Sequence, residues 1–356
     1  MIARLIRRTF WTAFFAVFLV FTGLETVFRL FDTLNHEHAD YSAYEIMLVT
    51  ASALPSRLYD HLALIILIAA ALGFGALSKT SEITIIRAAG VSRKRLVAMV
   101  VAALSPVLLA SIILVQFGIP HAEQLHLRLV DQPDAVSTAH RLWTRQAGAY
   151  VAYDVTPAGR VVSRTALQPD TESHTFKSVI VSGAGDADLE GRVTFQANRL
   201  MTFQDAFISS HETTQVVIDA TEYQRLQWMG TEPRALPVTA LWNASTYLKS
   251  ENLNFRHHEQ LFWARILLPV NLILMIAVAA AYSVGSTRQV DMGQRVFTSV
   301  LVGLIYKYCS DLVAFTVYLL TWPPILAPLV PVAGVLLALV VWDQRDRFRV
   351  SRSSVA

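Results

Sequence analysis

Residues 78–95 read SKTSEITIIRAAGVSRKR, a polar stretch that lies between two long apolar segments. One of its residues, Glu82, is acidic, and five are basic: Lys79, Arg87, Arg93, Lys94 and Arg95. A loop between membrane spans that carries such an excess of lysine and arginine stays in the cytoplasm. The sequence therefore predicts two spans joined by a cytoplasmic insert.

The same stretch predicts a short helix over residues 79–90. Ser81 or Thr80 can cap its start, and Gly90 can end it. Its apolar side is expected to consist of Ile83, Ile85 and Ile86. A helix held outside the bilayer by a span at each end is well placed to receive a push from a cytoplasmic partner.

Long apolar blocks on both sides of the insert predict an integral membrane protein. The chain has 356 residues, of which 54% are hydrophobic and 16% charged, and this is too apolar for a soluble protein of that length. We count six blocks of about 20 residues, the length that crosses the hydrocarbon core. They cover residues 10–31, 58–77, 96–119, 262–284, 296–320 and 325–342.

The basic residues outside the spans predict the orientation. If six spans alternate, the arginine-rich N-terminus, the 78–95 insert, the 285–295 loop with Arg288 and Arg295, and the arginine-rich tail all fall on one side. The positive-inside rule makes that side the cytoplasm, so both termini are expected there.

Between the third and fourth spans the sequence changes character. Polar and apolar residues alternate between turn signals such as 156–159, a pattern typical of short strands. The predicted strands are 150–155, 160–163, 178–182, 193–197, 206–209 and 214–219. The expected fold class is an α-helical membrane protein with six transmembrane helices and an inserted, extracytoplasmic all-β domain, a sandwich or open jelly roll. The expected division is 1–119 for three spans with the 79–90 helix, 120–236 for the β domain, and 237–356 for a connecting helix and three more spans.

Three charged residues lie near the outer end of the first span, Glu25, Arg29 and Asp32. Their spacing puts them on one helix face, with glutamate before arginine in the favourable order for a pair. In one interpretation Arg29 extends to the interface and pairs locally. In the other it offers a bidentate donor to a lipid phosphate. Arg57, before the second span, is another candidate for a head-group contact.

The first span also carries an aromatic stripe, and the fifth span carries a charged pair. Such a stripe usually packs against other helices, although it also suits a gate that admits acyl chains. It consists of Phe14, Phe18, Phe21, Phe28 and Phe31.

Lys307 and Asp311, in the fifth span, are four residues apart, and intramembrane charges face a protein interior or a wet cavity. Their pairing is either structural or functional.

Signatures of enzymes and nucleotide-binding loops are absent from the sequence, which has no HExxH, GxSxG, GxxxxGK[ST] or CxxC pattern. We therefore expect no catalytic residues, no metal site, no cofactor and no nucleic-acid partner. Any ATP must be hydrolysed by another subunit.

Two groups of residues resemble a known family. The first is GFGAL at 73–77, followed by SEI at 81–83 and AAGVS at 88–92. The second is Phe262-Trp263 with Pro269, then MGQRV at 292–296, and WPP at 322–324. With the order of spans and β insert, they are similar to the YjgP/YjgQ permeases, the membrane subunits of the lipopolysaccharide export ABC transporter. The second group resembles the G-type subunit more than its F-type paralogue.

The resemblance implies a permease of the bacterial inner membrane that extracts lipopolysaccharide and passes it to a periplasmic bridge. The implied partners are a cytoplasmic ATPase dimer (LptB-like), a paralogous F-type permease (LptF-like), a periplasmic bridge protein (LptC/LptA-like) and lipopolysaccharide itself. The implied ATPase-coupling residues are Ser81, Glu82, Ile83, Arg87, Ala88 and Gly90. The implied head-group contacts are Arg29 and Arg57. The implied lateral gate or cavity contains Glu25, Phe21, Phe28, Phe31, Lys307 and Asp311.

Two other functions are alternatives to transport. A mechanotransmitting or scaffolding permease would signal to a periplasmic partner and move no lipid. A lipid-modifying membrane enzyme would need a cluster of titratable residues at the membrane surface, and the sequence offers none.

Overall fold

The computed structural model describes residues 2–35, 42–130, 139–146, 149–169, 176–187, 192–195, 198–204, 207–212, 216–284 and 292–353. Its contacts divide the chain into two compact units, residues 1–119 with 259–356, and residues 120–258. Each unit is described by itself. Arg288, which the sequence placed in a basic loop, lies outside the described residues.

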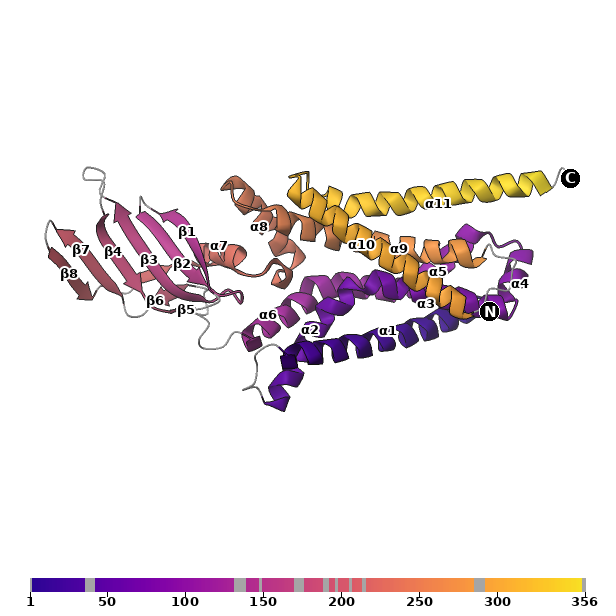
Figure 1. The fold of residues 1–356 in the computed structure, drawn as a ribbon, viewed down its shortest axis with the longest axis horizontal. Coiled ribbons are helices and arrows are strands. Elements are labelled where there is room, and N and C mark those ends of the chain that lie inside the picture. The colour runs from indigo at the N-terminus through magenta and orange to yellow at the C-terminus, as the bar shows by residue number, and fades with distance from the viewer. Residues whose placement is uncertain are drawn as a thin grey trace. The chain divides into compact units, whose positions relative to one another are not determined.

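The first unit is helical (Figure 1). Its helices are α1 (Ile2–Asn35), α2 (Ala43–Asp60), α3 (Leu62–Lys79), α4 (Glu82–Ala88), α5 (Arg93–Ile113), α9 (Arg256–Val284), α10 (Met292–Leu319) and α11 (Leu326–Ser353). A π-helical turn, Leu114–Gly118, continues α5. Among the described residues, six helices are long and apolar enough to cross a membrane. The prediction of six spans is confirmed.

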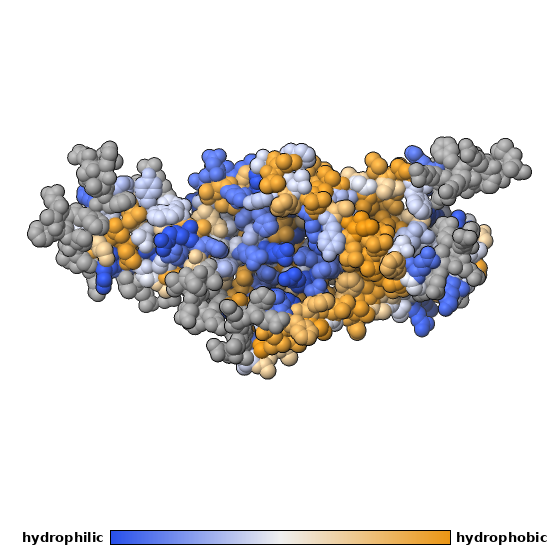
Figure 2. Space-filling view, viewed as in Figure 1, coloured by the Kyte–Doolittle hydropathy of each residue, from blue (hydrophilic) through white to orange (hydrophobic). Residues whose placement is uncertain are grey.

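Hydrophobic surface covers the middle of these helices, and hydrophilic residues lie at the end that holds α4 (Figure 2). The N-terminus, α4, the start of α10 and the end of α11 all lie at this one end (Figure 1). The segments that the sequence singled out as basic are therefore gathered together in the structure.

Helix α3 forms the centre of this unit, and α1 and α10 both pack against it. Small residues along α3 let its neighbours approach closely. Phe10 of α1 meets Phe74 of α3 edge to face, with ring centroids 4.9 Å apart, and both rings are fully buried. Gly73 lies under the same ring, because a Cβ built there would come within 2.7 Å of Phe10 Cδ1 and Cε1.

We expect Gly73→Ala to destabilise the helical unit by about 1–3 kcal/mol, the usual cost of overpacking a filled core. Phe10 cannot move aside cheaply because its ring is wedged against Phe74. Gly23→Ala on α1 is the matched control, since a Cβ at Gly23 has no neighbour within 4 Å. Thermal unfolding in detergent should show a lower midpoint for Gly73→Ala alone, and equal midpoints would contradict this packing.

The second span starts later than the sequence predicted. We placed its start at residue 58, but the helix breaks at His61, where α2 ends and α3 begins. Helix α2 itself was not predicted. The sequence does contain a signal for its start, a serine at position 42 followed three residues later by Glu45. In the structure these two residues form a capping box, in which Ser42 N donates to Glu45 Oε2 at 2.8 Å and Glu45 N donates to Ser42 Oγ at 3.3 Å.

The second unit contains two antiparallel sheets and several helices. The strands are β1 (His140–Gln146), β2 (Ala149–Val155), β3 (Val161–Pro169), β4 (Phe176–Ser182), β5 (Gly185–Ala187), β6 (Val193–Phe195), β7 (Arg199–Gln204), β8 (Phe207–Glu212) and β9 (Val216–Ile218). One sheet has the order β1-β2-β3-β4-β7-β8 and the other β5-β6-β9. The predicted fold class, six membrane helices with a β insert, is confirmed.

Helices accompany the strands in this unit. They are α6 (Ile119–Val130), α7 (Ala220–Gly230) and α8 (Val238–Ser250), with a 3-10 turn at Pro233–Ala235. Helix α7, which the sequence did not predict, packs on β1 and β2 and buries Leu226 with Tyr153 and Phe195. Helix α8 packs on α7 and groups with this unit, whereas the sequence-based division put it with the last three spans. The functional division of the chain stays a prediction.

Candidate functional site

The insert after α3 folds as expected into a short helix, α4, but its details differ. Ser81 stands at the N-cap position with φ 59° and makes no side-chain capping hydrogen bond, so the predicted cap at that residue is wrong. Gly90 has φ 84°, a left-handed conformation that glycine adopts without strain. The predicted end of the helix is confirmed.

The apolar side of α4 is narrower than predicted. Ile83 and Ile86 are buried in the helical core, but Ile85 is 67% exposed. Glu82 is partly exposed, and Arg87, Ala88 and Gly90 are exposed. Thus α4 is anchored by two isoleucines and presents a third to its surroundings, beside the charged residues that the sequence proposed for coupling.

Arg295, which the sequence analysis used for the orientation and for the family resemblance, forms hydrogen bonds with the elements around this insert. Arg295, at the start of α10, is buried, with 7% of its surface exposed. Its Nη2 donates to Ser78 Oγ at 3.4 Å, near the end of α3, and its Nη1 donates to the Ser283 carbonyl at 3.4 Å, near the end of α9. Ser299 Oγ donates back to the Arg295 carbonyl at 2.6 Å and also bonds the Tyr282 hydroxyl.

A second arginine, Arg93 at the start of α5, also holds the end of α9. Its Nη2 donates to the Ala280 carbonyl at 3.0 Å and to the Ala281 carbonyl. A cation at a helix C-terminus satisfies carbonyls that have no helical partner and complements the helix dipole. Four helices, α3, α5, α9 and α10, are therefore linked at this end by Arg93 and Arg295.

Arg29, one of the two candidate lipid-contact residues, lies near the C-terminal end of α1, and Arg57, the other, lies in the last turn of α2. Arg29 Nη1 donates to Asp32 Oδ2 at 2.8 Å. The structure does not pair Arg29 with Glu25, as the spacing suggested. Instead Glu25 Oε1 lies 3.4 Å from His61 Nδ1, at the break between α2 and α3.

His61 connects residues that the sequence left separate. Its Nδ1 lies 2.9 Å from the Arg57 carbonyl oxygen as well as near Glu25, and its ring centroid is 6.2 Å from that of Phe21. Both polar neighbours are acceptors, so Nδ1 must carry the proton to bond either. The structure thus brings together Glu25, Phe21 and the backbone of Arg57, whose side chain is exposed.

The aromatic stripe on α1 divides into two halves. Phe14 is buried and stacks on Phe18 at 5.7 Å, which fits the packing interpretation. Phe28 and Phe31 are 67% and 61% exposed, so they face lipid or a partner. Phe21 is partly exposed, and a gate that contains Phe21, Phe28 and Phe31 stays a prediction.

The charged pair on α10 is formed as predicted. Lys307 Nζ lies 2.9 Å from both Asp311 Oδ1 and Oδ2. The pair stands on an exposed face of α10, which also carries Tyr308, Leu312 and Phe315. Because paired charges in hydrocarbon are costly unless enclosed, this face is expected to be covered by protein or to line a wet cavity.

No group of three or more metal-ligating side chains occurs within the described part of the chain. The expectation of no metal site stays a prediction.

Comparison with known proteins identifies the family. The family model of the lipopolysaccharide export system permease LptF/LptG matches residues 4–345. Relatives include the lipopolysaccharide export system permease protein LptG of Haemophilus influenzae, 21% identical over 97% of this chain and 98% of that protein. LptG of Escherichia coli K12 is 22% identical over 93% of this chain and 94% of its own length. These relatives confirm the likeness to the G-type subunit, and the family match extends over nearly the whole chain. The chain belongs to the LptF/LptG family of lipopolysaccharide export permeases.

Proposed function

We propose that this chain is a permease subunit that extracts lipopolysaccharide from the inner membrane and passes it to a periplasmic bridge. Family membership supports a role in lipopolysaccharide transport, and six apolar helices suggest a multi-pass inner-membrane protein. The relatives are named as permease proteins of the lipopolysaccharide export system. In this proposal a separate cytoplasmic ATPase dimer hydrolyses the ATP, and an F-type paralogue completes the membrane pathway.

The observation that carries the proposal is the form of α4. It is a helix outside the long apolar segments, anchored by Ile83 and Ile86, with Ile85 exposed beside Glu82. It lies at the end of the unit where the basic segments gather (Figure 1). Basic loops stay in the cytoplasm, so α4 would be available to a cytosolic ATPase, and both termini would lie on the same side.

In this proposal, a movement of α4 caused by ATP hydrolysis would reach the membrane helices through the hydrogen bonds of Arg93 and Arg295. A push on α4 moves the end of α3, which contacts α10 through Arg295 and Ser78. Packed helices shift as rigid elements rather than deform continuously. A movement at α4 would therefore reach the exposed face of α10 that carries Lys307 and Asp311.

At the other end Arg29 would receive the lipid phosphate. It is already paired with Asp32 at 2.8 Å, so an entering phosphate would compete with that carboxylate. A phosphate offers more acceptor oxygens and more negative charge than a carboxylate, and arginine binds it with two parallel hydrogen bonds. Phe28 and Phe31, exposed on the same stretch of α1, would contact the acyl chains.

We expect Arg29→Ala to reduce lipopolysaccharide transfer about tenfold or more, because a hydrogen bond to a charged group contributes about 1.5–3 kcal/mol. Arg29→Lys should restore only part of the transfer rate, since the lysine ammonium cannot make the two parallel hydrogen bonds that a guanidinium makes to a phosphate. The measurement is release of lipopolysaccharide from proteoliposomes that contain the ATPase and the paralogous permease. Asp32→Asn is the control, because it removes the competing carboxylate and should not slow transfer. Normal transfer by Arg29→Ala at equal protein level would remove this role.

A further inference from the structure

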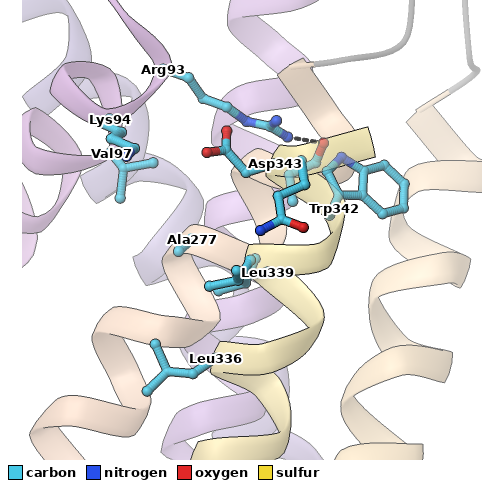
Figure 3. A pocket seen from close by; sticks show the side chains of 11 residues that line it. Arg93, Lys94, Val97, Ala277, Leu336, Leu339, Trp342 and Asp343 are labelled. Carbon is cyan, nitrogen blue, oxygen red and sulfur yellow. Dashed lines mark hydrogen bonds between the residues drawn. The ribbon is translucent and has the colours of Figure 1, made fainter. Parts of the chain in front are cut away.

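A cavity of about 520 Å³ lies between α5, α9 and α11 in the helical unit, and its volume is in the range of small-molecule sites. Its lining includes Arg93, Lys94 and Val97 of α5 and Leu339, Trp342 and Asp343 of α11. Figure 3 shows Arg93 and Asp343 at one end of the cavity and the leucines of α11 at the other. None of the predicted coupling, head-group or gate residues lines it.

The cavity crosses the boundary between the apolar and polar parts of its helices. Helix α5 begins with three basic residues, 93–95, and is largely apolar from Leu96 onward. The apolar run of α11 ends at Trp342, and tryptophan is enriched at the membrane–water interface. The polar end of the cavity therefore lies at head-group depth. It is at the end of the unit that holds α4 (Figure 1), which the excess of basic residues predicts to face the cytoplasm.

The polar end of the cavity has an excess of positive charge. Its lining contains two cations, Arg93 and Lys94, and one carboxylate, that of Asp343. Arg93 and Asp343 already have partners within the fold, Arg93 through its hydrogen bonds to the Ala280 and Ala281 carbonyls. Lys94 is exposed and, among the residues that the structure describes, forms no hydrogen bond or ion pair. The Lys94 ammonium is therefore the group at this end that a negatively charged ligand would meet.

The other end of the cavity is apolar and open to its surroundings. Leu336 and Val340 of α11 line it with 46% and 53% of their surface exposed, and Ala277 of α9 also lines it. Both α11 residues belong to the apolar run of that helix, so this end lies at acyl-chain depth. A ligand that fits both ends is an amphiphile with an anionic head group and an acyl chain, because inorganic phosphate would leave the apolar end uncovered.

We propose that this cavity binds an anionic phospholipid of the cytoplasmic leaflet, with its phosphate against Lys94 and one acyl chain along Val97 and Leu339. Basic pockets between membrane helices on the cytoplasmic side bind the head groups of anionic lipids. Phosphatidylglycerol, whose only charge is negative, balances the excess charge of the polar end. Phosphatidylcholine has the same phosphate, but its ammonium group adds a positive charge there and makes it the weaker ligand. The inference rests on the chain spanning the membrane in the orientation proposed above, and not on the transport of lipopolysaccharide or on the ATPase.

The test is native mass spectrometry of the intact, delipidated chain, incubated in detergent with equal amounts of phosphatidylglycerol and phosphatidylcholine that have the same acyl chains. The wild type should retain one phosphatidylglycerol in preference to phosphatidylcholine. Lys94→Gln should lower the apparent affinity for phosphatidylglycerol about fivefold, the contribution of one basic residue beside an anionic lipid. Arg95→Gln is the matched control and should keep the wild-type affinity, because Arg95 is also exposed and basic but does not line the cavity.

A variant that changes shape and not charge completes the design. Leu339→Trp should fill the apolar part of the cavity and reduce the retention of phosphatidylglycerol while leaving every charge in place. Equal retention of the two lipids by the wild type would overturn the proposal, and so would unchanged retention by Leu339→Trp. Equal losses from Lys94→Gln and Arg95→Gln would overturn it as well, because that result indicates general attraction to basic residues. The assay contains no ATPase and no lipopolysaccharide, so its failure leaves the proposed transport function to be decided by the release assay.

Discussion

Replacing Ile85 with aspartate is expected to abolish binding of the chain to the proposed ATPase subunit while the helical unit stays folded. Ile85 is the exposed isoleucine of α4, and Ile83 and Ile86 hold the helix to the core. A large apolar side chain presented outside the membrane core fits a pocket on a partner. Loss of such an anchor costs about 2–4 kcal/mol in binding, roughly a 30- to 1,000-fold drop in affinity. Co-purification of the ATPase with the solubilised permease measures this directly.

Three further variants make the result specific. Glu82→Ala should also lose the ATPase, because its carboxylate would pair with a basic residue of that subunit. Ile86→Asp should instead lower the unfolding midpoint, since it places a charge in the core. Ile2→Asp is the control, because Ile2 is an exposed isoleucine of α1 near the N-terminus. Intact co-purification of the Ile85 and Glu82 variants would contradict the coupling role of α4.

Arg295→Ala is expected to separate ATP hydrolysis from transport. The complex with the ATPase should form and hydrolyse ATP, because α4 keeps its exposed face. Lipopolysaccharide release should fall about tenfold or more, because the tie from α10 to Ser78 and to the Ser283 carbonyl is lost. Release and ATP hydrolysis measured in the same proteoliposomes give the ratio that reports coupling.

General loss of stability must be distinguished from loss of this tie. Removing one partner of a buried hydrogen bond costs about 1–3 kcal/mol, similar to the cost expected for Gly73→Ala. That variant is the matched control, since it should weaken the fold and leave the ratio of release to hydrolysis unchanged. An unchanged ratio of lipopolysaccharide release to ATP hydrolysis in Arg295→Ala would show that the movement of α4 is not transmitted through this residue.

Most of the fold could be predicted because long apolar blocks and alternating polar residues are strong signals. The six spans and the β insert follow from them. The strands β1, β5 and β7 were missed, and β3 continues six residues beyond the predicted strand, because pairing with neighbours, and not local pattern, fixes where strands begin and end. Helix α2 begins with a capping box at Ser42 and Glu45, a local pattern that indicates a helix start.

The contacts of the candidate residues could be predicted only in part, since Lys307 and Asp311 pair as their spacing suggested but other contacts differ. Helical spacing made Glu25 a partner for Arg29, yet His61, distant in sequence, takes Glu25 because a helix break brings it near. The sequence analysis grouped Ile85 with Ile83 and Ile86 because all three are apolar. Residues two apart on a helix do not share a face, so the structure buries Ile83 and Ile86 and exposes Ile85. Arg295 reads as one more basic loop residue, and its burial depends on tertiary packing.

The most direct test of the account is capture of lipopolysaccharide by a photoreactive residue at position 28, next to Arg29 and exposed on α1. The experiment uses proteoliposomes with the ATPase and the paralogous permease. We expect an adduct with lipopolysaccharide before ATP is added, and a marked fall in its yield during ATP hydrolysis as lipid leaves the site. A chain that only signals across the membrane would give no adduct, or an adduct whose yield is the same with and without ATP, and either result would contradict transport by this protein.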